Sequence, residues 1–285
     1  MTPPAYKVFC ISLRKESKSM GRVNTLVITG YGTNSHVETA YAATQAGADR
    51  ADIVHFSDIT ACNCSLDDYD FLIFPGGFLD GDDLGAAQAA GMRWRHLKDA
   101  SGTPLLDHLK KFLSDGKLVL GICNQLLVKL GLLPGFDGQI RRMVSLGHND
   151  SARFEDRWVC LLPNPKSPCV FTKNLPFMRM PVRHGEGKLV CADEACRQRL
   201  VDENLVALQY ADPETKQPTH EYPYNPNGSE LEAAGLTNPP GTVLGLMPHP
   251  EAFNHATNHP GWTRGEVDAP GTMLFLNAVQ YLRGL

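Results

Sequence analysis

Cys123 stands where a short apolar run meets a polar residue, a layout that could present a thiol as a nucleophile. Residues 118–120 are apolar without alternation, the pattern of a strand that is buried on both faces. Gly121 permits a tight turn, so we expect the strand to turn sharply into a helix that opens at Asn124. A helix N-terminus stabilises a thiolate, and the amide of Asn124 could donate to an oxyanion. A lone free cysteine is more often a small core residue, so the catalytic interpretation needs a base.

A candidate base closes a second apolar run near the other end of the chain. Residues 243–247 read as a strand, and His249 and Glu251 follow it with Pro250 between them. In an extended segment this spacing places both side chains on the same side. The imidazole could take the thiol proton while the carboxylate orients the ring and stabilises the imidazolium. An isolated His-Pro-Glu would more often be an exposed loop, so this motif too depends on its companions.

Two adjacent glycines follow a third apolar strand. Residues 71–74 are all apolar, and Gly76 and Gly77 come directly after Pro75. Backbone amides without a neighbouring Cβ can approach a ligand closely, and the carboxyl end of a strand in an open α/β sheet is where ligands bind. We therefore predict that the amides of Gly77 and Asn124 form an oxyanion hole. A plain turn would explain the glycine pair alone, but three such elements favour one catalytic site.

These motifs resemble those of the class I (triad) glutamine amidotransferases, and more narrowly the glutaminase component of phosphoribosylformylglycinamidine synthase. The cysteine turn and the His-Pro-Glu are shared by the wider superfamily. Two further segments narrow the resemblance, His-Gly-Glu-Gly at 184–187 and Asn-Pro-Asn-Gly-Ser at 225–229. The remaining matching segments lie at 32–34, 74–78, 81–85, 131–135 and 245–248.

The resemblance implies a reaction in two stages. Cys123 would attack the side-chain amide of glutamine, forming a γ-glutamyl thioester and ammonia, and water activated by His249 would release glutamate. The ammonia would pass to a separate ATP-dependent synthetase subunit, which converts formylglycinamide ribonucleotide to the amidine in purine biosynthesis. No cofactor is implied for this chain, since ATP and magnesium would bind the partner synthetase. The implied fold is a flavodoxin-like, mainly parallel, helix-covered α/β sheet with a short antiparallel extension.

The resemblance also implies a glutamine-binding site. The residues that it assigns to substrate binding are Gly76, Phe78, His184, Gly185, Asn225, Asn227, Gly228 and Ser229. His184 and Gly185 would line the site through their backbone, whereas residues 225–229 would lie near its mouth or at the synthetase interface.

Two residues depart from the family pattern. Gln125 stands where the family usually has glycine, and Leu127 stands where the family tends to place a glutamine that helps to hold the substrate. These departures leave open a non-catalytic binding or regulatory module, and also an amidase for another small amide. A peptidase-like cysteine hydrolase is disfavoured, because such enzymes take their histidine from the position that Asn124 occupies here.

The composition is that of an ordinary globular enzyme. The 285 residues are 42% apolar and 20% charged, with a net charge of −4, which argues against a nucleic-acid-binding protein. No apolar run approaches the ~20 residues of a membrane span, and residues 1–24 lack the apolar core of a signal peptide. Eight cysteines are too few for a disulfide framework, and none has a recognised metal spacing. We therefore expect a cytoplasmic protein with reduced thiols and without metal, membrane or nucleic-acid partners.

The elements that must position these residues alternate along the chain. We expect residues 1–24 to form an N-terminal extension and residues 25–285 the glutaminase domain. Strands are predicted at 25–29, 52–56, 71–74, 118–120 and 205–210, and helices at 37–47, 105–114, 193–201 and 272–282. This alternation predicts a parallel, helix-covered sheet, and short strands within 139–190 predict the antiparallel extension. Residues 211–240 are the least regular stretch, and residues 81–100 are a second candidate surface element. Both are predicted to flank the site and to form a face for docking the synthetase.

Overall fold

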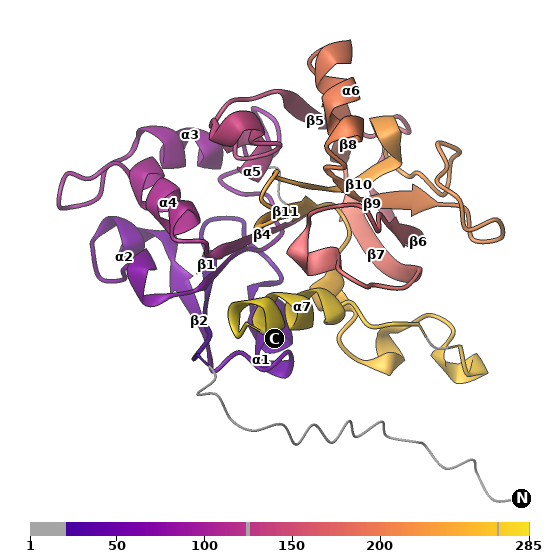
Figure 1. Ribbon diagram of the computed structural model, residues 1–285, viewed down its shortest axis with the longest axis horizontal. Helices are drawn as coiled ribbons and strands as arrows, with labels where there is room; N and C mark the ends of the chain where they lie inside the picture. The colour runs from indigo at the N-terminus through magenta and orange to yellow at the C-terminus, as the bar shows by residue number, and fades with distance from the viewer. Residues whose placement is uncertain (1–20, 124–125, 267, 285) are drawn as a thin grey trace, which may run out of the picture.

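A nine-stranded mixed sheet runs through the centre of the molecule (Figure 1), in a computed structural model that describes residues 21–123, 126–266 and 268–284. In sheet order the strands are β2 (Arg50–His55), β1 (Asn24–Thr29), β3 (Phe71–Phe74), β4 (Leu118–Ile122), β11 (Val243–Leu246), β10 (Ala233–Thr237), β9 (Val206–Ala211), β6 (Glu155–Pro163) and β7 (Met178–His184). Strands β2 to β11 in this order pair in parallel, and the pairs from β11 to β7 are antiparallel. A separate antiparallel pair joins β5 (Val144–His148) to β8 (Glu186–Cys191).

Helices cover both faces of the parallel half, as the alternation of elements predicts. The helices are α1 (His36–Gln45), α2 (Phe56–Thr60), α3 (Gln88–His96), α4 (Leu105–Ser114), α5 (Leu126–Leu130), α6 (Glu194–Asp202) and α7 (Met273–Leu282). Helices α1 and α7 pack on one face, whereas α2, α3, α4 and α5 pack on the other (Figure 1). None of the helices in the described part of the chain is long and apolar enough to cross a membrane.

Strand β3 shows why its apolar run does not alternate. Leu72 and Phe74 face the core beneath α3, α4 and α5, and Phe71 and Ile73 face the core beneath α1 and α7. All four side chains are at most 2% exposed. Because both faces of a parallel strand are buried, every position favours an apolar residue. Each such side chain contributes roughly 1.5–3 kcal/mol of transfer free energy on burial, which makes these central strands the rigid base of the site.

Two elements lie in stretches for which the sequence predicted neither a helix nor a strand. Strand β10 lies within residues 211–240, and its sequence Ala-Ala-Gly-Leu-Thr offers little large apolar surface although all five residues are buried. Helix α3 lies within residues 81–100, where Trp94 is only 3% exposed and packs in the core. Both stretches therefore contribute to the interior, and the antiparallel extension continues the main sheet through β10.

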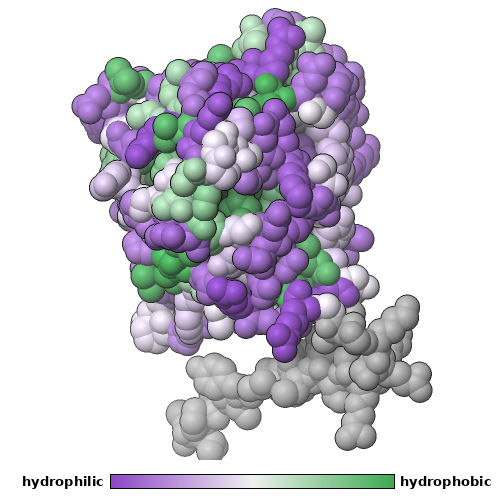
Figure 2. Space-filling view, turned by 90° about the vertical axis from the view of Figure 1, so that its left-hand side faces the viewer, coloured by the Kyte–Doolittle hydropathy of each residue, from purple (hydrophilic) through white to green (hydrophobic). Residues whose placement is uncertain are grey.

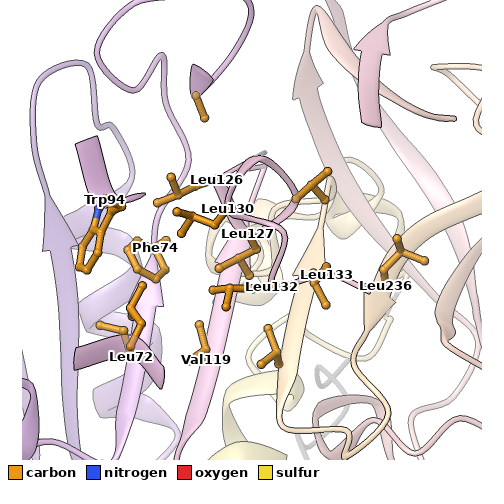
Figure 3. Close-up of a cluster of buried hydrophobic side chains, with 14 of the residues drawn as sticks. Leu72, Phe74, Trp94, Val119, Leu126, Leu127, Leu130, Leu132, Leu133 and Leu236 are labelled. Atoms are coloured by element: carbon orange, nitrogen blue, oxygen red, sulfur yellow. The ribbon is translucent and has the colours of Figure 1, made fainter. Parts of the chain in front are cut away.

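Leu127 lies in the hydrophobic core and does not face the Cys123 site. Its side chain is fully buried, and Figure 3 shows it among the leucines that α5 presses onto β4 and β11. It contacts the strand at Gly245, where an added Cβ would lie 3.7 Å from Leu127 Cδ1. Position 127, where the family tends to have glutamine, is therefore part of the apolar core in this protein.

We expect Leu127→Gln to lower the free energy of unfolding by ~3–5 kcal/mol, because it buries an amide without partners and disrupts leucine packing. Urea unfolding followed by circular dichroism measures the change. Leu276→Gln is the matched control, since Leu276 on α7 is 39% exposed and should tolerate the amide. Equal stability of the two variants would show that position 127 can accept a polar side chain.

Candidate active site

Three neighbouring parallel strands end at the same edge of the sheet. Strand β4 pairs with β3, with Gly121 opposite Phe74, and with β11, with Ile122 opposite Leu246. Each strand then continues into one of the predicted motifs, so that the glycine pair, the cysteine and the histidine emerge side by side. This edge is the usual ligand-binding end of an open α/β sheet.

Cys123 occupies a sharp turn directly after β4. Its φ angle is +51°, a left-handed conformation that costs energy for a residue with a side chain and that is typical of a nucleophile elbow. The backbone amide donates to the carbonyl oxygen of Leu246 at 2.7 Å, and the thiol donates to the carbonyl oxygen of Arg183 at 3.4 Å. The thiol is therefore held at the end of the sheet. Asn124 and Gln125 lie outside the described residues.

His249 and Glu251 form a buried pair. The Nδ1 atom of His249 lies 2.6 Å from Oε1 of Glu251, and the two residues are 3% and 0% exposed. Both side chains therefore lie on the same side, as predicted, but residues 250–252 form a short 3₁₀ helix and not the extended segment that the sequence predicted. The amide of His249 donates to the carbonyl oxygen of Pro181 at 2.8 Å, which ties the motif to β7.

The charges around His249 favour an imidazolium. Burial lowers the pKa of His249, but the charge of Glu251 and the charge and hydrogen bond of Cys123 outweigh it, and the pKa rises to about 10. The carboxylate of Glu251 accepts from Nδ1, so Nε2 is the ring nitrogen left to exchange a proton with Cys123. The arrangement therefore places a cationic imidazole beside the sulfur of Cys123.

The two glycines have separate roles. A Cβ added to Gly76 would lie 3.0 Å from Cε1 of His249 and 3.3 Å from Cβ of Cys123, so the two side chains meet over this residue. Gly77 has a φ angle of +134°, and an added Cβ would collide with the carbonyl oxygen of Gly32. The Gly77 amide has no acceptor among the described residues, which leaves it available to an oxyanion.

A cavity of about 850 Å³ opens over these groups. Its lining includes Cys123, His249, Glu251, Gly77, Phe78, His184 and Gly185, so most predicted site residues meet in one place. It also includes three charged residues that the sequence did not single out, Glu38, Arg153 and Arg183. Two further carboxylates of the lining, Asp82 and Glu186, lie within the matching segments 81–85 and 184–187. Burial, with the charges of Glu186 and Asp83, raises the pKa of Asp82.

His184 is a second buried histidine in this cavity. Asn149 donates through Nδ2 to the carbonyl oxygens of His184 and Arg153, so its Oδ1 accepts from Nδ1 of His184 at 3.0 Å. Burial, together with the positive charge of His249, lowers the pKa of His184 to about 4. His184 is therefore neutral beside a cationic His249 and presents only a lone pair at Nε2.

Residues 225–229 do not line the cavity, in contrast to their predicted role in substrate binding. The side chains of Asn225, Asn227 and Ser229 are at most 3% exposed. Asn227 donates to the carbonyl oxygen of Gly187 at 2.9 Å, and Ser229 Oγ accepts from the Leu189 amide at 2.9 Å. The Gly228 amide donates to Asn225, and an added Cβ there would collide with the Asp150 carboxylate. This segment therefore anchors β8, because buried backbone polar groups must be paired.

We expect Gly76→Ala to slow glutamine hydrolysis, the reaction that the motifs predict, by about a hundredfold, because the methyl group displaces Cys123 and His249 from each other. A coupled glutamate assay measures the rate, and thermal unfolding should be nearly unchanged. Gly147→Ala on β5 is the control, since an added Cβ there meets no atom within 4 Å. Unaltered hydrolysis in Gly76→Ala would contradict this geometry.

We expect Glu251→Gln to lower the pKa of His249 from about 10, because the carboxylate that raises it is removed while burial remains. An NMR titration of the His249 ring measures the shift. Alkylation of Cys123 by iodoacetamide at pH 7 should also slow by about tenfold, since the imidazolium that stabilises the thiolate is lost. The exposed Glu194 supplies a control, Glu194→Gln, and an unshifted His249 pKa in Glu251→Gln would remove Glu251 from this role.

Comparisons with known proteins identify the family of this chain. The family model of the CobB/CobQ-like glutamine amidotransferase domain matches residues 22–282. Phosphoribosylformylglycinamidine synthase subunit PurQ of Methanococcus maripaludis strain C7 is 38% identical over 90% of this chain and 96% of its own length. The subunit PurQ of Dehalococcoides mccartyi strain 195 is 37% identical over 93% of this chain and 99% of its own length.

A solved structure gives the same result at the level of the fold. The structure of PurLQS from Thermotoga maritima contains a chain that matches with a TM-score of 0.66 and 26% identity, covering 92% of this chain and all of that chain. The match includes both the parallel and the antiparallel halves of the sheet, as its coverage requires. With the sequence relatives, it shows that this chain belongs to the CobB/CobQ-like glutamine amidotransferase family.

Proposed function

We propose that this chain hydrolyses glutamine and supplies the ammonia for formylglycinamidine ribonucleotide synthesis in purine biosynthesis. The observation that carries the proposal is the meeting of Cys123 and the His249–Glu251 pair over Gly76. The relatives named PurQ support the reaction, and the PurLQS structure supports a role within an assembly of several subunits.

In the first stage, the Cys123 thiolate attacks the amide carbon of glutamine. The oxygen becomes an oxyanion, and the free amide of Gly77 donates to it. His249 then gives its Nε2 proton to the amide nitrogen, the carbon–nitrogen bond breaks, and ammonia leaves a γ-glutamyl thioester on Cys123. Glu251 keeps the ring oriented throughout, because it holds Nδ1 at 2.6 Å.

In the second stage, water replaces the departed ammonia. His249 is now neutral and takes a proton from the water, which attacks the thioester carbon. The carbon–sulfur bond breaks, glutamate is released, and the thiolate–imidazolium pair is restored. His184 stays neutral during this cycle because burial lowers its pKa to about 4, so it does not compete with His249 as a proton carrier.

The charged residues of the cavity suit the amino-acid end of glutamine. Arg153 and Arg183 can attract the α-carboxylate, and Glu38 and Asp82 can attract the α-ammonium group. Leu127 lies in the core and makes no such contact. Recognition in this protein therefore depends on these rim charges and on the backbone of His184 and Gly185.

We propose that the synthetase subunit docks over the mouth of this cavity. Phe78, Leu84 and Phe154 are exposed by 54%, 78% and 57%, so apolar side chains stand close to the opening. Leu84 belongs to the stretch 81–100 that was predicted to dock the partner. ATP and magnesium would bind that partner. We place the reaction in the cytoplasm, in keeping with the free thiols of the seven described cysteines.

We expect Cys123→Ser to abolish glutamine-dependent amidine formation in the complex with the synthetase subunit, because the hydroxyl is a far weaker nucleophile here. Synthesis supplied with ammonium chloride should continue at the unmodified rate, since the synthetase site is untouched. A Cys62→Ser chain, altered at an exposed thiol, is the control. Loss of both activities would show that Cys123 acts structurally, and hydrolysis of another amide in preference to glutamine would overturn the substrate assignment.

A further inference from the structure

A second cavity lies apart from the Cys123 site, on the face of the sheet that α2 and α3 cover. Its volume is about 280 Å³, close to the ~300 Å³ lower limit of small-molecule sites. Ile28 of β1 and Phe74 of β3 form its base, and Phe56 of α2 and Trp94 of α3 form its walls. We call it the aromatic cavity. It shares no lining residue with the Cys123 cavity.

Aromatic rings dominate the interior of the aromatic cavity. The Trp94 ring lies 5.3 Å from Phe56 and 5.4 Å from Phe74, and Figure 3 shows Trp94 beside Phe74 with Leu126 close by. Tyr31, which also lines the cavity, is 69% exposed and meets the His55 ring edge-on at 5.6 Å. Figure 2, which views the molecule from this side, shows apolar side chains set among hydrophilic ones where the surface is hollowed. Such walls favour a planar aromatic ring.

The aromatic cavity also contains an unused hydrogen-bond donor. Trp94 as a whole residue is 3% exposed, but its indole nitrogen keeps contact with solvent and has no acceptor within the part of the chain that the structure describes. A tryptophan N–H in such a place usually has a partner. An acceptor atom on a ligand would supply that partner.

The charge at the opening is positive. Arg93 lines the cavity, but its guanidinium is paired with Asp80 at 2.5 Å and lies over the Phe56 ring. Lys98 also lines the cavity, is exposed, and has no carboxylate within ion-pair distance among the described residues. The cation that remains available is therefore Lys98, and it favours an anionic ligand.

We propose that the aromatic cavity binds a small planar aromatic acid. Its ring lies against Trp94 and Phe56, a ring substituent or heteroatom accepts from the Trp94 N–H, and its acidic group faces Lys98. This assignment goes beyond the proposed glutaminase function, which uses none of these residues.

The position of the cavity links it to the oxyanion loop. Pro75 and Leu79 line the aromatic cavity, whereas Gly77 and Phe78 between them line the Cys123 cavity. The loop from Pro75 to Leu79 therefore contributes residues to both cavities. A ligand in the aromatic cavity would restrain this loop and change the reactivity of Cys123. This effect rests on the proposed function only if it is measured as glutamine turnover.

The test uses naphthalene-2-carboxylate as the probe and the purified full chain, with binding measured by calorimetry. We expect saturable binding at one site. Binding should be about fivefold weaker in Lys98→Glu, because the attraction between the exposed Lys98 and the carboxylate of the probe becomes a repulsion. Trp94→Phe should also weaken binding, by a few fold, since it removes the N–H and keeps an aromatic wall. Lys166→Glu is the matched control, an exposed lysine outside the cavity, and should bind as the unmodified chain does.

A second arm separates the two cavities. Chain alkylated at Cys123 with iodoacetamide should still bind the probe, and the probe should alter the alkylation rate of unmodified chain. Absence of binding, equal affinity in Lys98→Glu and Lys166→Glu, or loss of binding after alkylation would overturn the site assignment. An alkylation rate unaffected by saturating probe would overturn the link to the oxyanion loop. None of these readouts requires glutamine hydrolysis.

Discussion

The pairing of β4 between β3 and β11 is the constraint on which the site depends. Parallel strands in register end together, so three segments that are far apart in the sequence emerge side by side at one edge of the sheet. The strands are buried on both faces and leave little room for adjustment. The strain of the left-handed Cys123 can therefore be maintained by the surrounding sheet.

The antiparallel half of the sheet also contributes hydrogen-bonding groups to the site. The end of β7 provides the carbonyl oxygens of Pro181 and Arg183, which accept from the His249 amide and from the Cys123 thiol. Buried residues 225–229 hold β8, which follows β7 in the chain, through its backbone. Cys123 and His249 thus contact both halves of the sheet, and neither half alone contains the whole candidate site.

Electrostatics divides the two buried histidines between different roles. Both lose water on burial, which favours the neutral ring. At His249 the charges of Glu251 and Cys123 outweigh burial, whereas at His184 the charge of Glu155 does not. His249 is therefore held cationic and His184 neutral, although the two line the same cavity. A neutral His184 avoids the repulsion that a second buried cation would exert on the His249 imidazolium.

The sequence by itself determined the parallel strands and the positions of the cysteine, the His249–Glu251 pair and the glycine pair at their ends, because buried strands and their polar ends leave strong local patterns. Tertiary structure alone decided where the side chains of the other motif residues point. Residues 225–229 match a family segment, but their polar groups form hydrogen bonds with the backbone of β8. Leu127 occupies a motif position, but its side chain faces the core. Strand β10 and α3 were missed because small residues and mixed polarity gave no clear period. Contacts between distant segments supply that information, and a local pattern cannot contain it.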